Sequence, residues 1–180
     1  MKSLRELLQF VPSGRESHLL RRFNSEIGRK DTKPPSARTL AECLGFTVSE
    51  KELENGVSGY LEPDTFSEKG YAILVNSSMN VRRKRWTVLH EIAHYYLHVR
   101  TKPHDPFAPI KNRESKGYFY SREELKEERE ANAFVAALCF SDGALTAAIS
   151  DSNNDLQEIA NSMGLSLEAI KIAIQRCRRD

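Results

Sequence analysis

Five consecutive residues of this chain, His90-Glu91-Ile92-Ala93-His94, have the types and spacing needed to hold and use a metal ion. In an α-helix, with a rise of ~1.5 Å per residue and ~3.6 residues per turn, positions 90 and 94 stack on one face. Two imidazole nitrogens at this spacing can bind one metal ion. Glu91 lies about 100° round the helix, where it can reach a water on that ion without being a ligand. The pattern predicts His90 and His94 as ligands and Glu91 as the base of a zinc peptidase.

Two ordinary alternatives are exposed polar histidines and half-buried histidines satisfied by hydrogen bonds. The surrounding sequence predicts an amphipathic helix with a strong apolar face. Its apolar positions are Val88, Leu89, Ile92, Ala93, Tyr96 and Leu97. Polar side chains next to a hydrophobic core are unfavourable unless a partner organises them, so the context favours metal binding.

A third ligand is expected downstream, because a catalytic zinc takes three protein ligands and one open position. Residues 127–138 predict a helix that starts with several carboxylates. Glu128 shares a helical face with small residues and can point inward; Glu130 is the alternative, and Glu127 stays open. The carboxylates that are not ligands are explained by an acidic, solvated start of the helix, which the helix macrodipole favours. Asn132, one turn after Glu128, is predicted to bond the free ring nitrogen of a ligand histidine.

Residues 85–98 resemble the active-site helix of the ImmA/IrrE metallopeptidases, with an Arg-aromatic-Thr entry, the zinc motif and a trailing Leu-His. Residues 128–134 resemble the second motif of that family, E-x-x-A-N-x-F, and residues 72–76 its strand ending in Asn. The resemblance spans roughly residues 40–175. It implies that Glu128 is the third ligand.

The sequence departs from the family pattern just after the second motif. Residues 137–141 read Ala-Leu-Cys-Phe-Ser where the family often has Leu-Leu-Met-Pro, and Val135 stands where Ala is usual. These differences concern the following loop and the packing of the helix rather than the metal.

The resemblance implies an α+β fold that is mostly helical overall: a zincin-like metallopeptidase core with a small β-sheet or hairpin packed on the zinc-binding helices. It also implies one Zn²⁺ per chain and an endopeptidase that cleaves a helix-turn-helix transcriptional repressor, releasing mobile-element, phage or stress genes. Water on the zinc would attack the peptide bond, with Glu91 as base and then acid. Candidate oxyanion donors are Tyr95, His98, Tyr118 and Tyr120. His98 is also a rival ligand, since it lies one turn after His94.

Composition is that of an ordinary soluble protein, with 29% charged and 39% hydrophobic residues and a net charge of +2. Such a small charge does not argue for a polyanionic partner. Cys43, Cys139 and Cys177 form no C-x-x-C pair, which fits a reducing compartment and argues against a structural zinc site. No apolar stretch reaches membrane-spanning length, and residues 1–10 do not resemble a signal peptide. We therefore expect a cytoplasmic protein without a membrane partner.

The chain is expected to divide into an N-terminal helical extension and linker (1–38), a metallopeptidase core (39–150) and a C-terminal helix pair (151–180). The extension should be helical over residues 4–29, with a break near Pro12, followed by a loop at 30–37. A short helix is expected at 39–44.

Two strands, 57–61 and 71–75, are expected to pair as a hairpin ahead of the zinc helix, which should start between Val81 and Trp86. The basic run 82–85 opposes the helix dipole, so it is either a solvated loop or contacts an acidic substrate or nucleic acid. The irregular segment 100–121 should border the active-site cleft.

Residues 156–170 resemble a helix-turn-helix, with Gly164 at the turn and Ser166 as N-cap. A DNA-binding regulator is therefore an alternative function. The predicted second helix begins with Leu167-Glu168-Ala169-Ile170, which offers few base-reading donors, so packing against the core or docking of a substrate is favoured over DNA binding. A further alternative is a non-catalytic zinc protein of the toxin–antitoxin type, which would have no need of Glu91.

Overall fold

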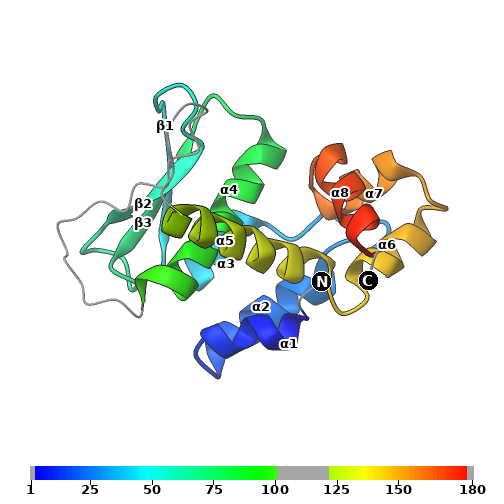
Figure 1. Cartoon of the computed structure of the whole chain (residues 1–180), viewed down its shortest axis with the longest axis horizontal. Helices are drawn as coiled ribbons and strands as arrows, with labels where there is room; N and C mark the ends of the chain where they lie inside the picture. Colours follow the sequence, from blue (N-terminus) through cyan, green and yellow to red (C-terminus); the bar gives the residue numbers. More distant parts are fainter. Residues whose placement is uncertain (1–2, 101–121, 178–180) are drawn as a thin grey trace. The chain divides into compact units, whose positions relative to one another are not determined.

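The computed structural model describes residues 3–100 and 122–177. By their internal contacts the residues form two compact units. The sheet unit comprises Ala37–Asn132, and the helical unit comprises Met1–Ser36 together with Ala133–Asp180. Figure 1 labels their elements in chain order. The fold is α+β and mostly helical, as expected from the sequence. The predicted three-part division at residues 38 and 150 stays a prediction.

The sheet unit contains a three-stranded mixed sheet in the order β1-β3-β2. Strands β2 (Gly59–Pro63) and β3 (Tyr71–Asn76) pair antiparallel, so the predicted hairpin is present. Sequence reasoning missed β1 (Thr47–Lys51), which pairs parallel to β3. Only one of its five residues is buried, so β1 lacks the apolar alternation that predicts a strand. Central β3 is almost entirely buried.

Helix α4 (Val81–His94) carries the zinc motif and packs against β3, β2 and helix α3 (Ala37–Cys43). The side chain of Asn80 caps its N-terminus by accepting a hydrogen bond from the backbone N–H of Arg83. A π-helical turn, η2 (Tyr95–Val99), continues it. The start of α4 lies within the predicted window, whereas the π-helix was not foreseen.

The basic run at the start of α4 is held by the sheet. Lys84 Nζ pairs with Glu50 Oε2 on β1 at 2.5 Å, and the Arg83 guanidinium donates to Ser58 Oγ at 3.1 Å. Glu50 and Ser58 thus stabilise two basic side chains whose positive charge opposes the helix dipole. Lys84 and Arg83 therefore fix α4 against β1 and the start of β2.

Gly59 lets β2 lie directly on α4. A Cβ atom at this position would stand 2.4 Å from the Leu74 carbonyl oxygen and 2.6 Å from Thr87 Cγ2, well inside van der Waals contact. Thr87 lies one turn before His90 on α4. The glycine thus sets the distance between the sheet and the helix that carries the motif.

The helical unit contains α1 (Leu4–Leu7), the short 3-10 helix η1 (Leu8–Phe10), α2 (Arg15–Glu26), α6 (Ala144–Asp151), α7 (Leu156–Met163) and α8 (Leu167–Cys177). The side-chain Nδ2 of buried Asn24, on α2, donates to the carbonyls of Leu138 at 2.9 Å and Ser141 at 3.3 Å. As predicted, α7 and α8 form a helix pair with Gly164 in the left-handed region at φ 64°.

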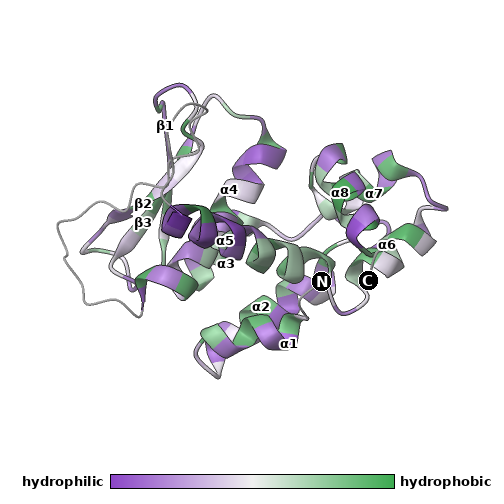
Figure 2. Ribbon diagram, viewed as in Figure 1, coloured by the Kyte–Doolittle hydropathy of each residue, from purple (hydrophilic) through white to green (hydrophobic). Residues whose placement is uncertain are grey.

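Helix α5 (Arg122–Phe140) belongs to the sheet unit up to Asn132 and to the helical unit beyond it. Figure 2 shows it changing from hydrophilic near its start to hydrophobic toward its end. Within the described residues no single helix is long and apolar enough to cross a membrane; α5 and α6 meet that criterion only together, bent by 51°.

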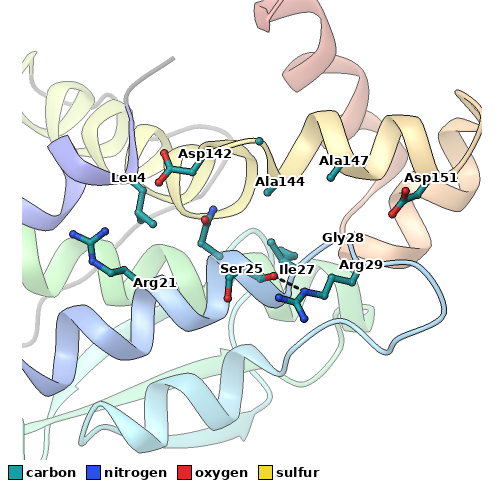
Figure 3. A pocket seen from close by; sticks show the side chains of 12 residues that line it. Leu4, Arg21, Ser25, Ile27, Gly28, Arg29, Asp142, Ala144, Ala147 and Asp151 are labelled. Atoms are coloured by element: carbon teal, nitrogen blue, oxygen red, sulfur yellow. Dashed lines mark hydrogen bonds between the residues drawn. The ribbon is translucent and has the colours of Figure 1, made fainter.

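A cavity of about 470 Å³ lies in the helical unit, between the end of α2 and the start of α6. Figure 3 shows Arg21 and Arg29 on the α2 side of this cavity and Asp142 and Asp151 on the other. No histidine or cysteine lines it. The cavity thus offers neither a metal-ligand cluster nor a thiol, and the chemistry of the sequence motif belongs to the sheet unit.

Candidate metal centre

Three side chains of the sheet unit converge on one point. His90 and His94 come from α4 and Glu128 from α5, and one donor atom of each lies within 4.8 Å of the others. The Nε2 atoms of the two histidines are 2.9 Å apart. Glu128 Oε2 is 3.1 Å from His90 Nε2, and its Oε1 is 3.2 Å from His94 Nε2. Helices α4 and α5 thus bring together the two histidines and a glutamate that lies far from them in the sequence.

This triangle of donor atoms fits a zinc ion. Bonds of ~2.0–2.1 Å in a tetrahedron separate neighbouring ligand atoms by about 3.3 Å. The observed edges of 2.9–3.2 Å are slightly shorter, so a small outward movement of the donors would admit the ion. Two imidazole nitrogens and a carboxylate are also a donor set that zinc prefers. In the described residues this is the cluster that could hold a metal.

The surroundings of His94 and Glu128 favour their metal-binding forms. Burial lowers the pKa of His94, which disfavours the charged ring. Burial opposes ionisation of Glu128, but hydrogen bonds from His90 and His94 and their charges outweigh it and lower the pKa of Glu128 to about 2. A neutral imidazole and an ionised carboxylate are the forms that bind zinc.

Glu91 is 1% exposed and sits on the same buried stretch of α4 as the two histidines. A carboxylate is seldom buried without a partner or a task, since desolvation of its charge is unfavourable. Its position directly after His90 matches the base of the sequence motif. The catalytic role of Glu91 stays a prediction.

The other two carboxylates considered as third ligands lie elsewhere. Glu130 Oε2 is 3.9 Å from His98 Nε2, and its Oε1 is 3.8 Å from the exposed Lys126 ammonium. Glu127 contributes its backbone carbonyl to His98 rather than a carboxylate to the cluster. The structure thus brings Glu128, and neither neighbour, to the two histidines.

Asn132 makes a different contact from the expected one. Its Nδ2 donates to the backbone carbonyl of Glu128 at 2.9 Å, one turn back along α5. A short amide side chain in a helix readily bonds the carbonyl four residues earlier, so this local bond competes with reaching a histidine on another helix. Asn132 therefore supports the turn that carries Glu128.

Of the candidate oxyanion donors, Tyr95 is packed among aromatic rings. It meets Phe46 edge-on at 4.9 Å and Tyr71 at 6.0 Å between ring centroids. This aromatic cluster anchors the end of the zinc helix on the sheet, a role that the sequence did not reveal. Tyr118 and Tyr120, and most of the predicted cleft segment 100–121, lie outside the described residues.

A comparison with protein-family models agrees with this geometry. The model of the peptidase M78 family, described as the IrrE N-terminal-like domain, matches residues 41–175. A search of curated proteins found no match. The match covers both helices of the metal cluster and well over half of the chain. The chain belongs to the M78 peptidase family, whose domain is the IrrE N-terminal-like domain.

Proposed function

We propose that this protein is a zinc-dependent endopeptidase whose ligands are His90, His94 and Glu128 and whose base is Glu91. One observation carries the proposal. Donor atoms of His90 and His94 on α4 and of Glu128 on α5 converge within 4.8 Å, and α4 also holds the buried Glu91 next to the first ligand. A structural zinc site would be closed by four protein ligands, whereas the cluster among the described residues has three and leaves a position for substrate chemistry.

Each residue has a defined task in this proposal. The ring nitrogens of His90 and His94 and the carboxylate of Glu128 would hold the ion. When bound, zinc polarises the scissile carbonyl and lowers the pKa of water toward neutrality. Glu91 accepts the proton of the attacking water and then donates it to the leaving amine. Burial of Glu91 keeps bulk water away from its carboxylate, so the proton is passed to the amine rather than lost to solvent.

We further propose that the substrate is a helix-turn-helix transcriptional repressor, whose cleavage derepresses mobile-element, phage or stress genes. Support comes from the resemblance to ImmA/IrrE metallopeptidases and from membership of the M78 family. The protein partner would be recognised outside the metal cluster.

The test uses wild-type protein and Glu91→Gln, both loaded with zinc and incubated with candidate repressors. The expected result is a discrete cleavage product with the wild type and none with Glu91→Gln. Both proteins should contain about one zinc per chain, because Glu91 is not a ligand. A variant that loses zinc would make Glu91 a ligand, and one that still cleaves would exclude it as the base.

A DNA-binding regulator remains the second candidate, because α7 and α8 form the expected pair around Gly164. The exposed side chains of α8 include both signs of charge and one apolar residue. They are Glu168, Lys171, Ile172, Gln175, Arg176 and Cys177. Duplex binding that weakens steeply with salt and survives Glu91→Gln would favour this function. Absence of such binding, with zinc bound and a repressor cleaved, would favour the peptidase.

A further inference from the structure

His98 lies beyond the zinc motif, in the π-helical turn that continues α4. It is 9% exposed, and its ring centroid is 5.3 Å from that of His94. Single π turns inside helices often occur at functional sites, since the wider turn redirects the side chains that follow it. Here the turn is closed by a bond from the Arg100 N–H to the Tyr95 carbonyl. His98 is thus a buried polar side chain whose task the metal cluster does not explain.

The ring of His98 reaches the helix that carries the third ligand. Its Nε2 lies 3.3 Å from the backbone carbonyl oxygen of Glu127, the residue before Glu128. A carbonyl can only accept, so this ring nitrogen carries the proton and donates. The same nitrogen is 3.9 Å from the carboxylate of Glu130, which also belongs to α5.

The peptide units on both sides of Glu128 therefore receive side-chain donors. His98 donates to the carbonyl of Glu127, and Asn132 donates to the carbonyl of Glu128. Asn132 belongs to α5 itself, so it stiffens the turn without fixing it to anything else. His98 comes from the continuation of α4, so its bond joins the turn bearing the third ligand to the helix bearing the other two.

We propose that His98 is a positioning residue that sets the place of Glu128 relative to His90 and His94. This inference rests on the proposed metal site and goes beyond it by assigning a residue that is not a ligand. A metal site needs its ligands held within about 0.5 Å of the productive geometry, and outer partners provide that precision. Removal of such a partner typically weakens metal binding about 10- to 100-fold.

Two other roles for His98 make different predictions. If His98 were a ligand in place of His90, its replacement by any residue without a ring nitrogen would abolish zinc binding. If it only filled space, replacement would lower the stability of the metal-free protein and leave the zinc Kd unchanged. The positioning role predicts that His98→Gln keeps the zinc affinity that His98→Ala loses, because the amide N–H of glutamine can also donate to the Glu127 carbonyl.

The experiment measures the zinc Kd of the full chain by competition with a chromophoric chelator, for wild type, His98→Ala and His98→Gln. His18→Ala, at an exposed histidine of α2, is the matched control for loss of an imidazole. The visible spectrum of the cobalt-loaded proteins reports the ligand set, and thermal unfolding of each metal-free protein reports stability. None of these readouts requires peptidase activity.

We expect His98→Ala to raise the zinc Kd about 10- to 100-fold, with His98→Gln close to wild type and His18→Ala unchanged. The cobalt spectrum should keep its wild-type band positions in His98→Gln. An unchanged Kd in His98→Ala, or a His98→Gln no better than alanine, overturns the proposal; so does a changed cobalt spectrum in His98→Gln. If His98→Ala does not fold, the Kd of His98→Gln still decides between donor and ligand. A wild type that binds zinc but cleaves nothing would refute the proposed function alone.

Discussion

The choice of third ligand can be tested by comparing Glu128→Ala with Glu130→Ala. Both substitutions remove one carboxylate from the same turns of α5, so they are matched in helix propensity and charge. Glu128 touches both histidines, at 3.1 and 3.2 Å, whereas the contacts of Glu130 with described residues are the longer ones to His98 and Lys126. Only the first substitution should weaken the binding of zinc strongly.

The size of the effect follows from linkage between binding and folding. Zinc at 100 times its Kd stabilises the folded protein by ~2.7 kcal/mol. For a chain of 180 residues this raises Tm by roughly 5–11 °C. Loss of a direct ligand should exceed the 10- to 100-fold effect of an outer partner, so a Kd raised at least about 100-fold is expected. At the same zinc concentration zinc would then stabilise Glu128→Ala by at most ~0.4 kcal/mol, which raises its Tm by about 1–2 °C.

The assay is thermal unfolding of each protein without metal and at one fixed zinc concentration, followed by a signal from the sheet unit. We expect Glu130→Ala to keep the wild-type rise in Tm, since pairs with exposed partners contribute at most about 1 kcal/mol. Equal losses in the two variants, or a larger loss in Glu130→Ala, would refute the assignment of Glu128.

Three shorter predictions follow. His94→Ala should purify with far less than the one zinc per chain of wild type; retention of the metal would remove His94 from the site. Gly59→Ala should destabilise the fold by about 1–3 kcal/mol in urea unfolding, because its methyl group meets Leu74 and Thr87, and a neutral result would contradict the close approach of β2 to α4. Asn24→Ala should cost about 1–3 kcal/mol by removing the buried side-chain donor to the carbonyls of Leu138 and Ser141, of which Ser141 keeps the Ala144 N–H. Ser25→Ala, at an exposed neighbour, should be nearly neutral.

The sequence predicted the candidate site residues whose spacing matches the turn of a single helix. Spacing alone indicated His90, Glu91 and His94. The amphipathic pattern around them predicted a helix beside the core, and all three residues are buried. The choice of Glu128 as third ligand required more than spacing, because three neighbouring carboxylates fit the local sequence pattern. Only the placement of α5 beside α4 distinguishes them. The family resemblance supplied that choice, and the structure agrees with it.

What the sequence missed depends on contacts between distant residues. β1 is an exposed edge strand whose residues give no alternating pattern, so only its pairing with β3 defines it. The π-helical turn has a composition that an α-helix could also have, and its first residue, Tyr95, packs edge-on against the distant Phe46. Asn132 was assigned to a histidine because spacing cannot tell a local backbone bond from a contact across helices.

The contacts that hold α4 on the sheet determine whether the metal site forms before zinc binds. α4 is fixed to the sheet by Lys84 with Glu50, by Arg83 with Ser58 and by the close approach at Gly59. None of these contacts involves a ligand, so the helix should keep its place when zinc is removed. Small zinc domains that lack such contacts unfold without their metal. Here zinc should bind a largely preformed site, and chelation should lower Tm and abolish activity while leaving the helical circular dichroism of the protein at room temperature unchanged.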